Sequence, residues 1–113
     1  MNEKVVNTFI VVWDMTGLET VIDVADLISE DVMKRLRDEK GSTLGQTMFI
    51  LTQRAKANSH RHYEIYSVQA NPDITKEMIA EMFKNDPQGS ADLIRERGTK
   101  IYSDRIGKVQ VIT

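Results

Sequence analysis

The chain has 113 residues, a formal net charge of −2 and no cysteine. A chain of this length is expected to form one domain, residues 1–113, with one hydrophobic core. The lack of cysteine excludes disulfide bonds, thiolate zinc sites and cysteine nucleophiles. No segment approaches the ~18 apolar residues of a membrane-spanning helix, and the small net charge gives no strong field toward nucleic acid or anionic lipid. The totals therefore describe a globular protein without a membrane span.

Two strands are expected near the start of the chain. The run TFIVVWD, residues 8–14, is continuously apolar and rich in β-branched residues, which is typical of a central strand covered on both faces. After MTG, the segment LETVIDV, residues 18–24, alternates apolar and polar side chains as a half-buried strand does. The short loop with a glycine predicts a hairpin. A helix over 18–27 remains the alternative, because some of these apolar residues also fit a helical face.

Two helices are expected next. Ser29 is a suitable N-cap for the segment SEDVMKRLRDEK, which a glycine ends. Thr43 and Gln46 form a capping box for a second helix over 44–57, whose apolar residues recur at helical spacing. The intervening KGSTLGQT is not a phosphate-binding loop, because its lysine precedes the glycine. We interpret it as a tight turn between helices.

The second half of the chain returns to strand and helix pair. The segment HRHYEIYSVQA, residues 60–70, is rich in strand formers. Thr75 is expected to cap one helix and Asp86 the next. Gly89, early in the second of these helices, should weaken it by about 1 kcal/mol relative to alanine. Two final strands, TKIYSDR and KVQVIT, are expected to join around Gly107.

The expected element order is ββααβααββ, which places the chain in the α+β class. We predict a mainly antiparallel sheet with helix pairs packed on one face. The first strand is apolar on both sides, so its second face also needs a cover. Either a helix crosses over to that face or a second subunit supplies the cover. The second alternative favours a homo-oligomer, with a symmetric dimer as the first choice.

Both histidines lie in SHRHYEIYS, residues 59–67. On a strand, His60, His62 and Glu64 would line one face, about 7 Å apart. The pattern is short and a complete metal site would need a further ligand, so no metal is predicted. The favoured interpretation is the solvent-facing side of a strand. The alternative is that His62 acts as a ligand-binding or general acid–base group near neutral pH.

Asp14 ends the first strand, where a loop could place its carboxylate in a cleft, although aspartate also forms turns. A small-molecule-binding or hydrolytic pocket would combine Asp14 with His62 and Glu64, and with Tyr102 or Arg105. No catalytic motif and no cofactor motif is present, which favours a non-enzymatic protein and leaves catalysis open. The candidate ligand-binding residues are His62, Glu64, Asp14, Tyr66 and Arg105.

Binding of single-stranded nucleic acid is a further alternative. Tyr63, Tyr66 and Tyr102, framed by arginine and lysine, could stack on bases. Acidic residues interrupt the basic ones, however, and Tyr63 and Tyr66 would lie on opposite faces of a regular strand. No ribonucleoprotein motif is present. Nucleic-acid binding is therefore not favoured.

Three stretches, TFIVVWDMTGLE, RHYEIYSVQA and KIYSDR, resemble a group of small proteins encoded by tailed phages that infect cyanobacteria. The likeness extends over most of the chain. It implies a viral protein in the cytoplasm of the infected host cell and assigns no activity or ligand. Combined with the missing catalytic motif, it leads to the main hypothesis of a non-enzymatic, oligomerising protein that binds or regulates a host or phage macromolecule.

Overall fold

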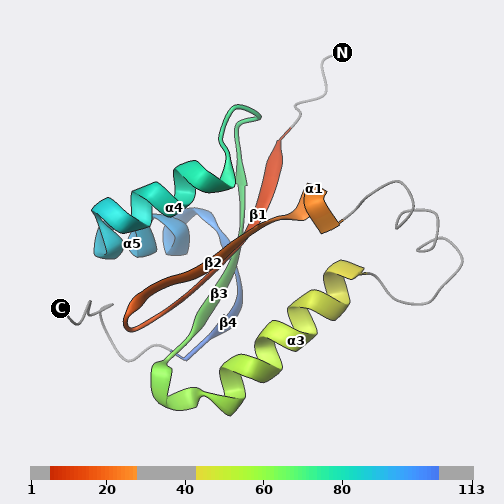
Figure 1. The fold of residues 1–113 in the computed structure, drawn as a ribbon, viewed down its shortest axis with the longest axis vertical. Helices are drawn as coiled ribbons and strands as arrows, with labels where there is room; N and C mark the ends of the chain where they lie inside the picture. Colours follow the sequence, from red (N-terminus) through yellow and green to blue (C-terminus); the bar gives the residue numbers. More distant parts are fainter. Residues whose placement is uncertain (1–5, 28–42, 105–113) are drawn as a thin grey trace, which may run out of the picture.

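A computed structural model describes residues 6–27 and 43–104 of the chain. Its centre is a four-stranded antiparallel sheet with the strand order β2-β1-β3-β4 (Figure 1). The strands are β1 (Asn7–Asp14), β2 (Gly17–Asp23), β3 (Glu64–Ala70) and β4 (Thr99–Ser103). The helices are α1 (Val24–Leu27), α3 (Thr43–Ala57), α4 (Lys76–Asn85) and α5 (Pro87–Arg97), with a 3₁₀ turn η1 at Ser59–Arg61. The predicted α+β class with an antiparallel sheet is confirmed.

The hairpin at the start of the chain is tight. Asp14 pairs with Gly17, so that only Met15 and Thr16 lie between the two strands. Gly17 has a φ of 129°, a backbone conformation that residues other than glycine rarely adopt. The segment after the turn is a strand, as the alternation predicts, and helix begins only with the four-residue α1.

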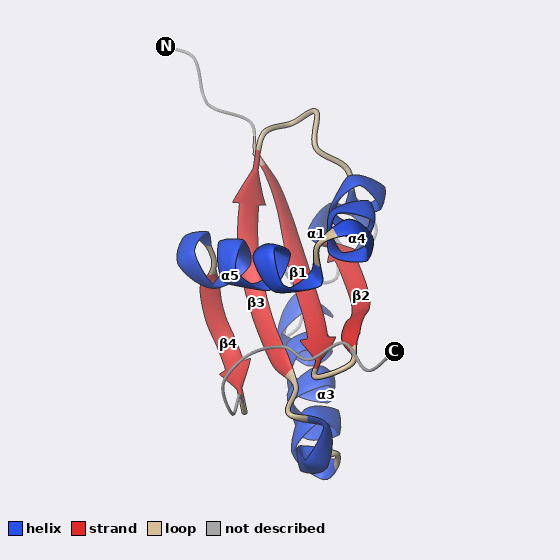
Figure 2. Ribbon diagram, turned by 90° about the vertical axis from the view of Figure 1, so that its left-hand side faces the viewer, coloured by secondary structure: helices blue, strands red, loops and turns tan. Residues whose placement is uncertain are grey.

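The helices cover both faces of the sheet. Helices α4 and α5 lie on one face and α3 lies on the other (Figure 2). Along β1, Phe9, Val11 and Trp13 belong to the core under α4 and α5, whereas Ile10 and Val12 belong to the core under α3. The one-face arrangement therefore holds for α4 and α5 but is wrong for α3. The reason is that β1 is apolar on both sides, and a crossing helix covers the second one.

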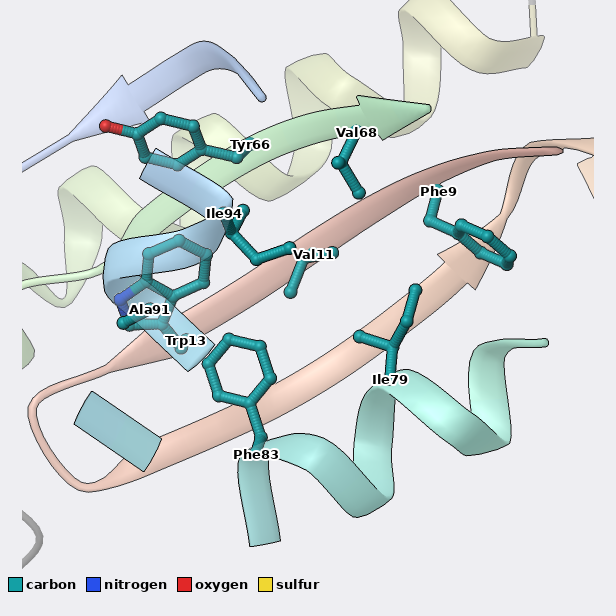
Figure 3. Close-up of a cluster of buried hydrophobic side chains, with 9 residues drawn as sticks. All are labelled: Phe9, Val11, Trp13, Tyr66, Val68, Ile79, Phe83, Ala91 and Ile94. Atoms are coloured by element: carbon teal, nitrogen blue, oxygen red, sulfur yellow. The ribbon is translucent and has the colours of Figure 1, made fainter. Parts of the chain in front are cut away.

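The larger core lies between the sheet and helices α4 and α5 (Figure 3). The ring of Trp13 stacks on Tyr66 at 5.3 Å between centroids and meets Phe83 of α4 at 5.5 Å. Aromatic pairs in such geometries contribute about 0.5–1.5 kcal/mol beyond the area that they bury. Ile79 and Ile94 complete the contact from the two helices. Large aromatic side chains close this face of the sheet around Trp13.

Side-chain caps fix where α4 and α5 begin, as predicted. Thr75 accepts a hydrogen bond from the amide of Met78 at 3.2 Å, and Asp86 accepts one from the amide of Gly89 at 3.0 Å. A Cβ at Gly89 would lie 2.1 Å from Oδ2 of Asp86. The expectation that Gly89 weakens the helix is thus incomplete. Because glycine has no Cβ, the carboxylate of Asp86 can lie close enough to cap the helix.

The helix expected after Ser29 and the last strand around Gly107 fall outside the described residues. Within residues 6–27 and 43–104, no helix combines the length and the apolar character that crossing a membrane requires.

Candidate functional site

The polar residues singled out from the sequence gather at one end of the sheet. Here β1 ends, β3 begins and β4 ends, and Glu64 pairs with Trp13 on one side and with Ser103 on the other. Adjacent strand residues point to opposite faces of a sheet. The polar groups at this end are consequently divided between the α4/α5 face and the α3 face.

The histidines do not lie on a strand. Residues 59–61 form η1, and His62 follows with a left-handed backbone, φ 55° and ψ 58°. The carbonyl oxygen of Arg61 accepts a hydrogen bond from the amide of Met15 at 3.1 Å, and this bond anchors the turn against the β1–β2 hairpin. His60 is exposed, and Nδ1 of His62 lies 3.0 Å from the carbonyl oxygen of Asp104. The predicted row of His60, His62 and Glu64 on one strand face is therefore wrong, because the strand begins only at Glu64.

Glu64 is buried, with 2% of its surface exposed, so its predicted place on a solvent-facing strand is also wrong. Its carboxylate accepts hydrogen bonds from Nε1 of Trp13 at 3.0 Å and from Nε of Arg95 at 3.0 Å. Nη2 of Arg95 donates to Oε2, the oxygen that also accepts from Trp13. Oγ of Ser103 lies 3.3 Å from Oε1, the oxygen that accepts from Nε of Arg95. Every polar atom of this carboxylate is thus occupied.

Arg95 of α5 is the partner that sequence reasoning missed. Hydrogen bonds to Glu64 raise the pKa of Arg95, and Nη1 also contacts Asp92 at 2.8 Å. The guanidinium carbon lies 5.7 Å from the centroid of the Trp13 ring, within cation–π range. A bidentate pair of this kind is rigid, and its charge is compensated inside the protein. The arrangement is that of a structural link between α5 and the sheet.

Asp14 is equally buried but lies on the other face. Its Oδ1 accepts hydrogen bonds from the amide of Thr16 at 2.8 Å and from the Thr16 hydroxyl at 2.5 Å. Its Oδ2 lies 2.8 Å from Nη2 of Arg61, an ion pair without the alignment of a hydrogen bond. A hydrolytic pocket would need Asp14, His62 and Glu64 within reach of one another. The structure instead gives each of the three its own separate partners.

A second polar cluster joins α3 to the sheet. The hydroxyl of Tyr63 donates to Oε1 of Glu19 at 3.0 Å, and the same oxygen accepts from Nη2 of Arg54 at 2.6 Å. Burial and the hydrogen bond to Glu19 raise the pKa of Tyr63. Arg61 lies over the Tyr63 ring at 5.5 Å from the centroid. Glu19 and Arg54 are far apart in the sequence, so only their opposite charges could have suggested the contact.

The remaining candidates do not form a stacking platform within the described part of the chain. Tyr63 and Tyr66 are 1% and 8% exposed, and Tyr66 is stacked on Trp13. Tyr102 is partly buried beside the core under α3. Arg105 lies outside the described residues. Among residues 6–27 and 43–104, no group of three or more acidic or histidine side chains has the geometry to hold a metal ion.

Comparison with known proteins adds nothing to this geometry. The chain matched no protein-family model, no curated protein and no solved structure.

The outer face of α3 differs from the polar end of the sheet, where the buried charges are paired. Phe49 and Ile50 each expose 64% of their surface, more than any other large apolar residue whose side chain the structure describes. They lie at the middle of a helix that contains no acidic residue. Ala55, which faces the sheet, is buried. We define the outer face of α3 by its exposed central residues, Gln46, Phe49, Ile50 and Gln53.

Proposed function

We propose that this protein is a non-enzymatic protein that self-associates through the outer face of α3. The observation that carries the proposal is the exposure of Phe49 and Ile50, which are neighbours in the sequence and each expose 64% of their surface. Exposed apolar side chains that are grouped, rather than scattered singly, mark contact surfaces.

The composition of the outer face supports a protein contact. Its four residues are uncharged, and the charged residues of the described helix, Arg54 and Lys56, lie toward its C-terminal end. Depletion of charge and enrichment of aromatic residues distinguish the centre of an interface from the remaining surface. An exposed helix normally carries charged side chains on its solvent side. This face departs from that rule over about two turns.

The spacing of the four residues supports a second copy of the same chain as the partner. A two-fold axis midway between Phe49 and Ile50, perpendicular to an antiparallel helix pair, sets Phe49 against Ile50 of the partner. The same axis sets Gln46 against Gln53 of the partner, where two amides can exchange hydrogen bonds. The basic C-terminal turns then lie at opposite ends, so that their charges do not meet.

The size of the contact sets the strength that we expect. Helix α3 has 15 residues and is about 22 Å long. One helix pair of this length lies at the small end of protein interfaces, below roughly 1,200 Å². We therefore expect a dissociation constant on the order of 10 µM to 1 mM, rather than an obligate dimer.

The resemblance to cyanophage proteins supports the cytoplasm of an infected host cell as the place where this protein acts. A weak dimer in the host cell cytoplasm can respond to protein concentration during infection, because its population follows mass action. We propose that the dimer binds or regulates a host or phage macromolecule. The compensated charges at the polar end of the sheet support a binding role over catalysis.

Sedimentation equilibrium over a concentration series, from about 5 µM to about 1 mM, tests the proposal. The weight-average mass should rise toward that of a dimer. Ile50→Gln should keep the protein monomeric throughout. Met78→Gln is the matched control, since Met78 is 49% exposed on α4 and lies outside the proposed contact. A mass that stays monomeric at the highest concentration contradicts the proposal.

Charge pairs test the antiparallel geometry. Replacing both Gln46 and Gln53 with glutamate places like charges opposite one another in the dimer and should weaken it. Combining Gln46→Glu with Gln53→Lys places opposite charges there and should strengthen it. If the two double variants dimerise equally, the two-fold axis lies elsewhere.

A further inference from the structure

A cavity of about 320 Å³ lies at the far end of β3 from the polar cluster, between α4 and α5. Its volume falls at the lower end of the range of small-molecule sites, about 300–1,000 Å³. Most of its wall is apolar, and the main contributors are Val68, Ile74, Ile79, Met82, Leu93 and Ile94. It lies on the α4/α5 face, so it is separate from the proposed self-association surface on α3.

The apolar wall is continuous with the larger core. Val68, Ile79 and Ile94 line the cavity and also belong to the buried cluster drawn in Figure 3. Their positions are held by the sheet, by the capped α4 and by α5. The wall is therefore built into the fold rather than formed by loops, as expected of a pre-formed site.

The rim of the cavity is polar and carries one positive charge. Gln69, Asn71 and Arg97 line it, and all three are exposed. Four arginines lie in the described ranges, and Arg54, Arg61 and Arg95 each pair with a carboxylate. Arg97 forms no ion pair with any residue in those ranges. A guanidinium in this situation selects a planar anionic group such as a carboxylate.

We propose that this cavity binds a small amphipathic carboxylate, of the medium-chain fatty-acid type. The alkyl chain lies against Val68, Ile79 and Ile94, and the carboxylate lies at the rim beside Arg97. The amide of Asn71 provides a further hydrogen-bond donor there. The shape of the site, apolar within and cationic at its mouth, matches the two ends of such a molecule.

Amide chemical shifts measured by NMR during titration with sodium octanoate test the proposal. The shifts should saturate and should concentrate in residues 68–74, 79–82 and 93–97. In the series butanoate, hexanoate and octanoate, each added methylene should tighten binding about fourfold, the increment expected for burying one such group. Octylamine, which has the same chain and the opposite charge, should bind more weakly than octanoate.

Three variants locate the site. Arg97→Gln should weaken octanoate binding about three- to tenfold, as expected for loss of a charge-assisted contact. Lys84→Gln, which removes an exposed cation from the last turn of α4, is the matched control and should leave it unchanged. Ala70→Leu, which adds bulk to the cavity wall, should reduce the affinity more for octanoate than for butanoate.

Several outcomes would overturn the proposal. Shifts that fail to saturate, or that concentrate on α3, place the ligand elsewhere or nowhere. An affinity that does not depend on chain length means that the apolar wall takes no part. Equal weakening by Arg97→Gln and Lys84→Gln reduces the effect to the net charge of the protein.

Discussion

The two faces of the sheet each bury one carboxylate, and they bury it differently. Glu64 and Asp14 are both 2% exposed. Glu64 is held by Arg95, whose side chain is 10% exposed, and it accepts further hydrogen bonds. Asp14 is paired with Arg61, whose side chain is 43% exposed, and one of its oxygens has no aligned donor. The α4/α5 face excludes water from its ion pair, whereas the α3 face does not.

The apolar layers show the same difference. Helices α4 and α5 bury Ile79, Phe83, Ala91 and Ile94 against the sheet. In α3 only Ala55 is buried among the residues whose side chains the structure describes, and Phe49 is exposed. We infer that the α4/α5 face supplies most of the stability of the monomer. The α3 face retains apolar surface that a partner can cover.

Breaking the two ion pairs should give the largest contrast. Glu64→Gln leaves the charge of Arg95 buried beside Trp13 with only the exposed Asp92 as its ionic partner in the described part of the chain. Loss of one partner from a buried pair typically costs about 3–5 kcal/mol. Asp14→Asn should cost about 1 kcal/mol, because Arg61 can turn to water and the amide oxygen still accepts from Thr16. The free energy of unfolding in urea measures both losses.

A double variant separates the cost of an orphaned charge from the value of the pair. Replacing Glu64 with leucine and Arg95 with methionine together should recover part of the loss caused by Glu64→Gln, since no unpaired charge then remains buried. Equal losses for Glu64→Gln and Asp14→Asn would show that the two faces shield charge alike.

Truncating one isoleucine on each face tests the apolar layers. Ile94 is 4% exposed and Ile50 is 64% exposed. Ile94→Ala should lower the free energy of unfolding by about 2–5 kcal/mol, because it removes buried methyl groups and enlarges the cavity that Ile94 lines. Ile50→Ala should change it by no more than about 0.5 kcal/mol in dilute monomer. A large loss for Ile50→Ala would mean that the outer face of α3 packs within the monomer.

Most of the secondary structure on both faces of the sheet follows from local sequence signals. Alternation in residues 18–24, the glycine after the hairpin turn and the caps at Thr75 and Asp86 predict the elements that the structure contains. These signals act over a few residues and do not depend on the remainder of the fold. The continuous apolar run of β1 likewise predicts a strand that is covered twice.

Partners that are distant in sequence could not be predicted in this way. Glu64 and Arg95 are 31 positions apart, and Tyr63 is 44 positions from Glu19. Period-two reasoning placed His60 and His62 on a strand, but the backbone of His62 is left-handed and the strand starts two residues later. A residue pattern gives the period of a strand without giving its first residue. The cavity beside Arg97 depends on how α4 and α5 meet, which has no local signal.

The smallest contrast concerns proton binding on the α3 face. The pKa of Tyr63 is raised in the folded protein, by burial and by its hydrogen bond to Glu19. In the unfolded chain this tyrosine titrates near its ordinary pKa of about 10. Stability from the neutral hydroxyl is therefore fully present below about pH 10, and it is lost as the pH rises through the raised pKa, because the unfolded chain releases its proton first.

Tyr63→Phe isolates this contribution. It should cost about 1 kcal/mol near neutral pH, since one hydrogen bond is lost while Glu19 keeps Arg54. It should also reduce the decline in unfolding free energy above about pH 10. Tyr102→Phe is the control. Burial also raises the pKa of Tyr102, but no hydrogen bond to a carboxylate contributes to that shift. If the alkaline decline is equally steep in wild type and Tyr63→Phe, Tyr63 titrates alike in the folded and unfolded chain. The hydrogen bond between Tyr63 and Glu19 then contributes no measurable stability through the protonation of Tyr63.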